Sequence, residues 1–164
     1  MKKNNQTLDP KTQIGHVHLK VADLNRSVKF YAEVLGFEIM TRYGDQAAFL
    51  SAGGYHHHIG LNTRESKNGN PPPKGSTGLY HFAILVPNRK ELARVLKRLM
   101  ERNYLIEGVS DHGVSEAIYL TDPDGNGIEI YADRPRGKWP KDAKGNIEMF
   151  TKSLDIGSLM KELK

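Results

Sequence analysis

Apolar and polar residues alternate along residues 14–21, which is the period of a β-strand with one buried face. The two faces carry Val17, Leu19 and Val21 on the apolar side and His16, His18 and Lys20 on the polar side. A helical period follows over residues 24–35. Asp23 is placed to cap the start of this helix, and Gly36 to end it.

Three further strands complete the first half of the chain, and they are expected at residues 37–43, 46–51 and 56–62. Residues 63–77 are rich in Asn, Gly, Pro, Ser and Lys, which is typical of a linker. The same order then returns, with a strand, a helix and three strands at residues 79–86, 88–102, 104–107, 116–120 and 127–131. Because the identity between the halves is low, the order of elements is the argument for a repeat.

The repeated order predicts an α+β fold built from two βαβββ modules. We divide the chain into a disordered or extended N-terminus (1–13), a first module (14–63), a linker (64–77), a second module (78–134) and a C-terminal extension (135–164). In the extension, residues 156–163 could form a short helix that packs onto the body through Leu159 and Leu163. The extension either covers an edge strand or closes a lid.

Composition narrows the classes of function. The 164 residues carry a net charge of +5 without a basic stripe that is interleaved with aromatic residues, which argues against nucleic-acid binding. The absence of cysteine excludes disulfides, thiolate metal sites and a cysteine nucleophile. No apolar run is long enough to cross a membrane, and the first residues have no apolar signal core. We therefore expect a cytoplasmic protein that binds neither nucleic acid nor a membrane.

Three residues carry the candidate chemistry. His16 and His81 head the first strand of each half, and Glu129 lies in the last strand of the second half. Two imidazoles and one carboxylate on one side of a divalent metal leave positions open for substrate and dioxygen, as in non-haem iron(II) oxygenases. Each residue also has a plain structural reading, since strand faces carry polar residues and Asp122-Pro-Asp-Gly125 is an ordinary turn sequence.

The doubled module resembles the vicinal-oxygen-chelate (glyoxalase-like) superfamily over residues 14–134. The resemblance is carried by residues 16–31 with 34–37, by residues 78–86 and by residues 122–129. It implies one open, cupped mixed sheet around a divalent metal, with the helices on its outer face. It also implies His16, His81 and Glu129 as ligands and places the fourth ligand position on Gly60. Glyoxalase I enzymes have a carboxylate there, whereas extradiol ring-cleaving dioxygenases use three ligands.

Further motifs resemble the catechol 2,3-dioxygenases. Residues 49–61 resemble the segment with their acid–base histidine, which matches His57, and residues 117–125 resemble their tyrosine-bearing strand, with Tyr119. His112 resembles a further active-site histidine, with a spacing to Tyr119 that is short by about two residues. The resemblance implies proton transfer by His57 and contacts from Tyr119 and His112 to the substrate oxygens. Those dioxygenases usually carry four modules in one chain, and this chain has two.

The run His56-His-His58 leaves an alternative open. Strict strand alternation puts His58 on the face of Gly60, and His57 on the other face. The family match favours His57, and a β-bulge after Gly54 would reconcile the two assignments. We expect His18 and His58 to line the substrate pocket rather than to bind metal.

These features favour an iron(II)-dependent extradiol dioxygenase that cleaves a catechol-type ring with dioxygen. Manganese, nickel or zinc could replace iron in such a site, and a homodimer is compatible with it. The substrate would be a small aromatic diol. Two alternatives stay open within the same fold. One is a glyoxalase-type or thiol-transferring metalloenzyme, as in fosfomycin-resistance proteins. The other is a metal-free module that sequesters a drug, like the bleomycin-binding proteins.

Overall fold

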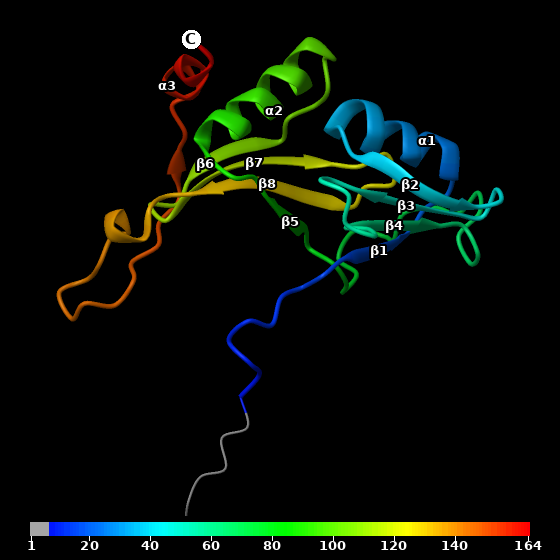
Figure 1. The fold of residues 1–164 in the computed structure, drawn as a ribbon, viewed down its shortest axis with the longest axis horizontal. Helices are drawn as coiled ribbons and strands as arrows, with labels where there is room; N and C mark the ends of the chain where they lie inside the picture. The colour runs from blue at the N-terminus through cyan, green and yellow to red at the C-terminus, as the bar shows by residue number, and fades with distance from the viewer. Residues whose placement is uncertain (1–6) are drawn as a thin grey trace, which may run out of the picture.

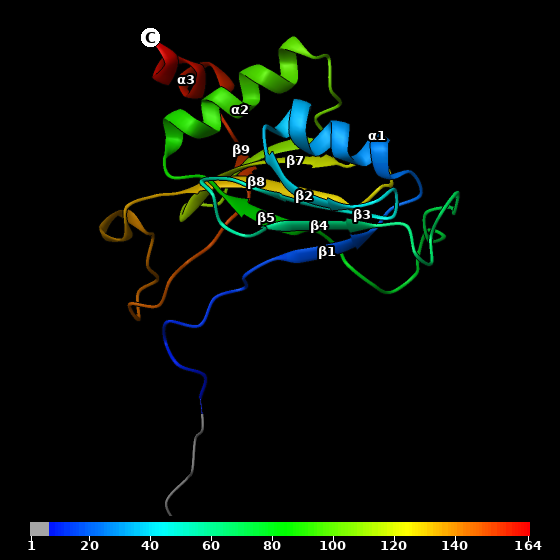
Figure 2. The same cartoon turned by 45° about the vertical axis from the view of Figure 1, so that its right-hand side comes forward.

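The computed structural model describes residues 7–164, whose elements form two similar sets and a C-terminal extension (Figures 1 and 2). The first set comprises β1 (Val17–Lys20), α1 (Leu24–Lys29), the π-helix η1 (Phe30–Leu35), β2 (Glu38–Tyr43), β3 (Ala47–Ser51) and β4 (Ile59–Asn62). The second set comprises β5 (Phe82–Leu85), α2 (Arg89–Glu101), β6 (Gly108–Asp111), β7 (Ser115–Thr121) and β8 (Gly127–Asp133). The extension contains η2 (Arg136–Lys138), β9 (Lys152–Ser153), α3 (Ile156–Met160) and η3 (Lys161–Leu163).

Both sets build the same mixed sheet. The strand orders are β1-β4-β3-β2 and β5-β8-β7-β6-β9, and in each the first strand lies parallel to the fourth. Helices α1 and α2 cover the same side of the sheets (Figures 1 and 2). The α+β class and the doubled order of elements are confirmed. One detail differs, because among residues 7–164 the strands form two hydrogen-bonded sheets rather than one continuous cupped sheet.

Caps define the two main helices. The Asp23 carboxylate accepts a hydrogen bond from the backbone of Arg26, and the Asn88 side chain does the same for Glu91. The predicted helix over residues 24–35 begins as α-helix and continues as π-helix, in which Gly36 N–H donates to the carbonyl of Tyr31 (3.1 Å). Gly36 then ends the helix with φ of 94°.

The strand predicted at residues 104–107 of the second module is wrong, since β6 begins only at Gly108. Asn103 has a positive φ of 51°, and the side chain of Tyr104 turns into the molecule. Its ring lies 4.9 Å from that of Phe30, and its hydroxyl donates to the carbonyl of Thr121 (2.8 Å). The apolar residues of this stretch therefore serve contacts with the first module, and they do not form the buried face of a strand.

Two carboxylates in the turn between β7 and β8 join the modules; we call residues 122–126 the Asp turn. Asp124 accepts hydrogen bonds from the backbone of Ala22 (3.0 Å), the hydroxyl of Ser27 (3.0 Å) and the guanidinium of Arg26 (2.6 Å). Asp122 accepts from the buried hydroxyl of Tyr31 (3.0 Å). Burial, together with the charge of Asp122, raises the pKa of Tyr31, so its hydroxyl remains a donor.

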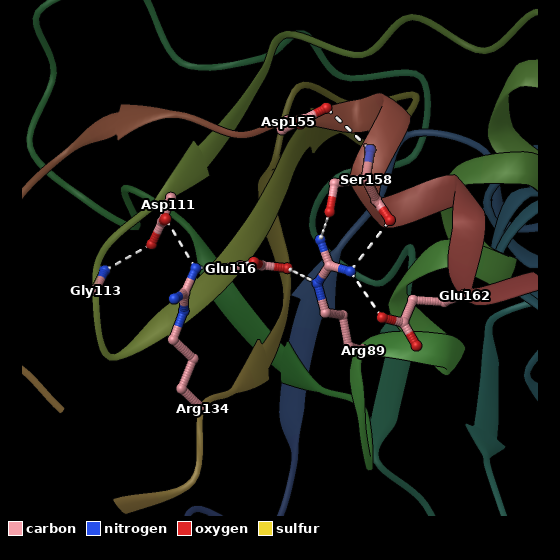
Figure 3. Close-up of polar contacts among 8 residues, drawn as sticks. All are labelled: Arg89, Asp111, Gly113, Glu116, Arg134, Asp155, Ser158 and Glu162. Atoms are coloured by element: carbon pink, nitrogen blue, oxygen red, sulfur yellow. Dashed lines mark hydrogen bonds and ion pairs between the residues drawn. The ribbon is translucent and has the colours of Figure 1, made fainter. Parts of the chain in front are cut away.

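The C-terminal extension covers an edge strand, which decides between the two roles left open by its sequence. Strand β9 pairs with β6, and Leu159 of α3 is fully buried. Figure 3 shows how ion pairs attach the extension. Arg89 donates to Glu116 (2.7 Å) and to Glu162 (2.8 Å), and Glu116 also accepts from Arg134 (2.9 Å).

The N-terminal prediction is only partly covered by the structure. Residues 1–6 of the segment 1–13 lie outside the described residues. Residues 7–13 are exposed and contain one turn, in which Thr12 N–H donates to the carbonyl of Asp9 (2.8 Å). Between residues 7 and 164, no helix has the length and apolar character needed to cross a membrane.

We predict that Asp124→Ala lowers the free energy of unfolding by about 1–3 kcal/mol, because it leaves the buried Ser27 hydroxyl and the Ala22 N–H without their acceptor. Urea denaturation measures the loss. Asp142→Ala is the control, because the Asp142 carboxylate accepts hydrogen bonds from Lys144 and Asn146 of its own exposed turn. Equal losses in both variants would show that the Asp turn does not hold the modules together.

Candidate metal and substrate site

Four predicted site residues of the second module form one hydrogen-bonded row. Glu129 on β8 and Tyr119 on β7 are cross-strand partners, and the Tyr119 hydroxyl donates to Glu129 Oε1 (2.8 Å). His81, the residue before β5, places Nε2 3.1 Å from Glu129 Oε2. At the other end, His112 Nε2 lies 2.7 Å from the Tyr119 hydroxyl oxygen. An imidazole and a carboxylate therefore face each other, with two further proton-exchanging groups behind them.

His81, Tyr119 and His112 of this row line a pocket of about 400 Å³, and Glu129 contacts both His81 and Tyr119. The other polar groups that line the pocket include Glu107, Ser110 and Thr151. Burial is the main cause that raises the pKa of Tyr119, and the hydrogen bond to Glu129 acts in the same direction. Tyr119 is thus a neutral hydrogen-bond donor at physiological pH, suited to a substrate oxygen or a developing negative charge.

The histidines of the first module gather in a second cluster. The rings of His16 and His57 lie 4.3 Å apart, and that of His57 lies 5.0 Å from Phe49. The ring of His18 contacts Phe49 edge-on at 5.7 Å. Desolvation, followed by the neighbouring His16 and His56, lowers the pKa of His57. His57 is accordingly a neutral imidazole near pH 7, which is the form that accepts a proton.

His57 and His58 have different surroundings. His58 Nδ1 lies 3.0 Å from Ser51 Oγ and accepts from the backbone of Ala52 (3.3 Å). The ring of His57 instead packs against that of His16, with an interplanar angle of 47°. The backbone of His58 still bonds to both neighbouring strands, because its N–H donates to the Leu50 carbonyl (2.9 Å) and its carbonyl accepts from Val17 N–H (3.0 Å). Strand alternation therefore still places His58 on the face of Gly60, and both assignments of the acid–base histidine stay predictions.

Two of the three predicted ligands are brought together. His81 and Glu129 are in contact, whereas His16 lies with His57 in the first module. Among residues 7–164, no group of three or more His, Asp or Glu side chains is arranged to hold a metal ion. His16 and His81 also precede β1 and β5 by one residue, so the prediction that both lie within strands is wrong.

Strand register relates the two modules at the position of the fourth ligand. Gly60 pairs with His18, two residues after His16, just as Glu129 pairs with Ala83, two residues after His81. Gly60 is therefore the counterpart of Glu129. A Cβ at residue 60 would meet the ring of His18 at 3.0 Å, so this position has no room for a side chain while His18 keeps its place.

Comparisons with known proteins agree with this architecture. The family model described as Glyoxalase/Bleomycin resistance protein/Dioxygenase superfamily matches residues 13–130. The chain belongs to this superfamily. A glyoxalase/dioxygenase from Nostoc punctiforme shares the fold with a TM-score of 0.65 at 23% identity, over 80% of this chain and 99% of that one.

Two curated proteins that are similar to this chain are covered by the match to different extents. A catechol-2,3-dioxygenase of Bacillus subtilis (strain 168) is 48% identical over 92% of this chain, but the match spans only 52% of that protein. A metallothiol transferase FosB of Staphylococcus epidermidis is 31% identical over 73% of this chain and 81% of its own length. The chain thus spans about half the length of the first relative and most of the second.

The C-terminal extension contributes a contact to the site that the sequence did not predict. His112 Nδ1 lies 2.9 Å from the Phe150 carbonyl oxygen, which can only accept, so Nδ1 carries a hydrogen. Nε2 is then the atom that exchanges a proton with Tyr119. Because Tyr119 has one proton, it can give it to Glu129 or to His112, but not to both. A backbone carbonyl has no sequence signature, so sequence reasoning had no signal for this contact.

We predict that Phe150→Ala speeds the exchange of the His112 Nδ1 proton about tenfold, the value of one hydrogen bond. The Phe150 ring packs against Gly113, where an added Cβ would meet it at 2.6 Å, and this packing fixes the carbonyl. Histidine-selective NMR of the full chain measures the exchange. Met149→Ala, which removes a neighbouring exposed side chain, should leave it unchanged. An unaltered proton signal in Phe150→Ala would refute the positioning role.

Proposed function

We propose that this chain is a metal-dependent extradiol dioxygenase-like enzyme that cleaves a catechol-type ring with dioxygen. The observation that carries the proposal is the hydrogen-bonded row His81–Glu129–Tyr119–His112, in which a predicted ligand pair adjoins two groups able to bind phenolic oxygens. Three of its members, His81, Tyr119 and His112, line one pocket. The catechol-2,3-dioxygenase relative at 48% identity supports the same substrate class, a small aromatic diol.

The donor set fits a divalent metal. His81 and Glu129 offer a nitrogen and an oxygen about 3 Å apart, and imidazole with carboxylate suits Fe(II), our first choice, as well as Mn, Ni or Zn. When bound, such a metal supplies Lewis acidity and open positions at which the diol and dioxygen meet. The absent side chain at Gly60 favours three protein ligands over four.

The remaining residues bind and move protons. His57, whose pKa is lowered, takes a proton from the diol, while Tyr119 donates a hydrogen bond to one substrate oxygen. His112, whose Nδ1 hydrogen is held by the Phe150 carbonyl, accepts a hydrogen bond from the other substrate hydroxyl through Nε2. The contact of 2.8 Å between the Nδ1 atoms of His56 and His57 orients the second ring.

We propose further that a second copy of the chain completes the metal centre with its His16. Strands β1 and β5 are sheet edges without a further partner among residues 7–164, and the predicted ligands His16 and His81 directly precede them. Large apolar side chains flank these edges, with Ile14 92% and Tyr80 91% exposed. Such exposure favours association. A two-fold dimer that pairs unlike modules would form two equivalent sites.

The proposed activity is tested by anaerobic addition of Fe(II) to the purified chain, followed by catechol and dioxygen. We expect a yellow ring-fission product and matching dioxygen consumption. Glu129→Gln should weaken metal binding more than about a hundredfold, since even partners outside the ligand set contribute ten- to a hundredfold. Glu148→Gln, at an exposed glutamate of the extension, is the matched control and should retain both properties.

Thiol transfer is the second candidate function. The chain covers 81% of the relative named metallothiol transferase, and the predicted ligand set of two histidines and one glutamate suits that class as well. Consumption of a thiol co-substrate by the metal-loaded chain, with no dioxygen uptake in the presence of any catechol, would replace the dioxygenase proposal by this one.

The completed site is tested by mixing two inactive variants. His16→Ala and Glu129→Ala should each lack the metal centre alone. After subunit exchange, half of the dimers are mixed, and each mixed dimer has one intact site, so about a quarter of the sites should return. Metal content and turnover both report this recovery. If no metal binding or activity returns while sedimentation shows mixed dimers, His16 acts within its own chain or not at all.

A further inference from the structure

A second, smaller pocket lies on the first module, beside His18. It has a volume of about 180 Å³ and is lined by His18, Tyr43, Ala47, Phe49, Asn62 and Arg64. Strand register explains why these side chains meet. Asn62, Ala47 and Tyr43 form one cross-strand row, and His18, Gly60 and Phe49 form the next. The side chains of both rows alternate with the core-facing residues, so they share the open face of the sheet.

The two ends of this pocket have different chemistry. Tyr43 and Phe49 form an aromatic wall, with ring centroids 5.7 Å apart and an interplanar angle of 79°. Asn62 and Arg64 form the polar end. The side-chain oxygen Oδ1 of Asn62 accepts a hydrogen bond from the backbone N–H of Arg64 (3.2 Å). The side-chain NH₂ of Asn62 is therefore left as a donor.

The charge at the polar end is not neutralised nearby. Arg64 makes no ion pair with another side chain in the part of the chain that the structure describes, and the adjacent Glu65 pairs with Lys20 instead (3.5 Å). A guanidinium presents several donors in one plane and matches a carboxylate. An aromatic wall with a cationic, donor-rich end is therefore complementary to an aromatic ring that bears an acid.

Aromatic rings connect this pocket to the candidate metal ligand. Phe49 contacts His57, and His57 contacts His16, with centroid distances of 5.0 and 4.3 Å. The volume is below the roughly 300–1,000 Å³ of pockets for drug-sized ligands, which argues for a single ring with a short arm.

We propose that this pocket binds an aryl carboxylate, with its ring against Tyr43 and Phe49 and its carboxylate on Arg64 and Asn62. The inference rests on the proposed function where it concerns the substrate. The diol cleaved by the enzyme would then carry a carboxylate arm, and Arg64 would select it over neutral catechols. Binding itself needs neither metal nor turnover.

The test is an NMR titration of the full-length, metal-free chain with phenylacetate, compared with 2-phenylethanol, which has a similar size without the charge. We expect phenylacetate to shift the amide signals of Phe49, Asn62 and Arg64 and to bind about tenfold more tightly than the alcohol, as one charge-assisted contact allows. Arg64→Gln should remove this preference. Phe49→Leu should weaken both ligands.

Arg42→Gln is the matched control. Arg42 lies on the same sheet, but it pairs with Ala48 on the opposite face and donates to Asn25 (3.0 Å). It should leave the preference unchanged. Equal affinity for the two ligands, an equal effect of both arginine variants, or absence of shifts at the pocket residues would overturn the proposal. Acid-selective binding by a chain that cleaves no catechol would instead contradict the proposed function alone.

Discussion

The carboxylates of the Asp turn are the constraint on which the arrangement of the two modules depends. Asp124 holds the start of α1, Asp122 holds Tyr31 in η1, and β8 begins directly after the turn at Gly127. A Cβ at Gly127 would approach the carbonyl of Tyr80 to 2.2 Å, so glycine allows the close contact of this strand start with the residue before His81. The same short segment therefore joins the modules and sets Glu129 against His81.

Local signals predicted the helices and inner strands well. Asp23 and Asn88 each cap a helix through the hydrogen bond expected from their type, and the doubled order of elements follows from periodicity alone. The predictions failed where contacts with residues far away in the sequence determine the local structure. Residues 104–107 pack against Phe30 instead of forming a strand, and β1 and β5 are shorter than predicted, with four residues each.

The candidate site likewise has a part that local sequence motifs predict and a part that they do not. Motif and position along the chain single out His81, Tyr119 and Glu129, and strand register then brings them together. The partner of His112 is a backbone carbonyl, and the ion pairs of Arg89 join residues up to 73 positions apart, so neither has a local pattern. Separation of His16 from Glu129 depends on how whole modules pack, which a sequence repeat does not specify.

Which sheet edges are covered and which are open bears on the proposed metal centre. Unpaired edges invite association, and proteins commonly cover them. Here β9 of the extension pairs with the edge strand β6, and Arg89 of α2 holds the following helical segment through Glu162. Strand β5 at the opposite edge has no outer partner among residues 7–164 and lies beside His81. Strand β1, beside His16, likewise has no outer partner in the described part of the chain. Strand β2 is a further edge without an outer partner between residues 7 and 164, but only β1 and β5 adjoin predicted metal ligands. A chain whose open edges include the two beside His16 and His81 is suited to build its metal centre where two copies meet.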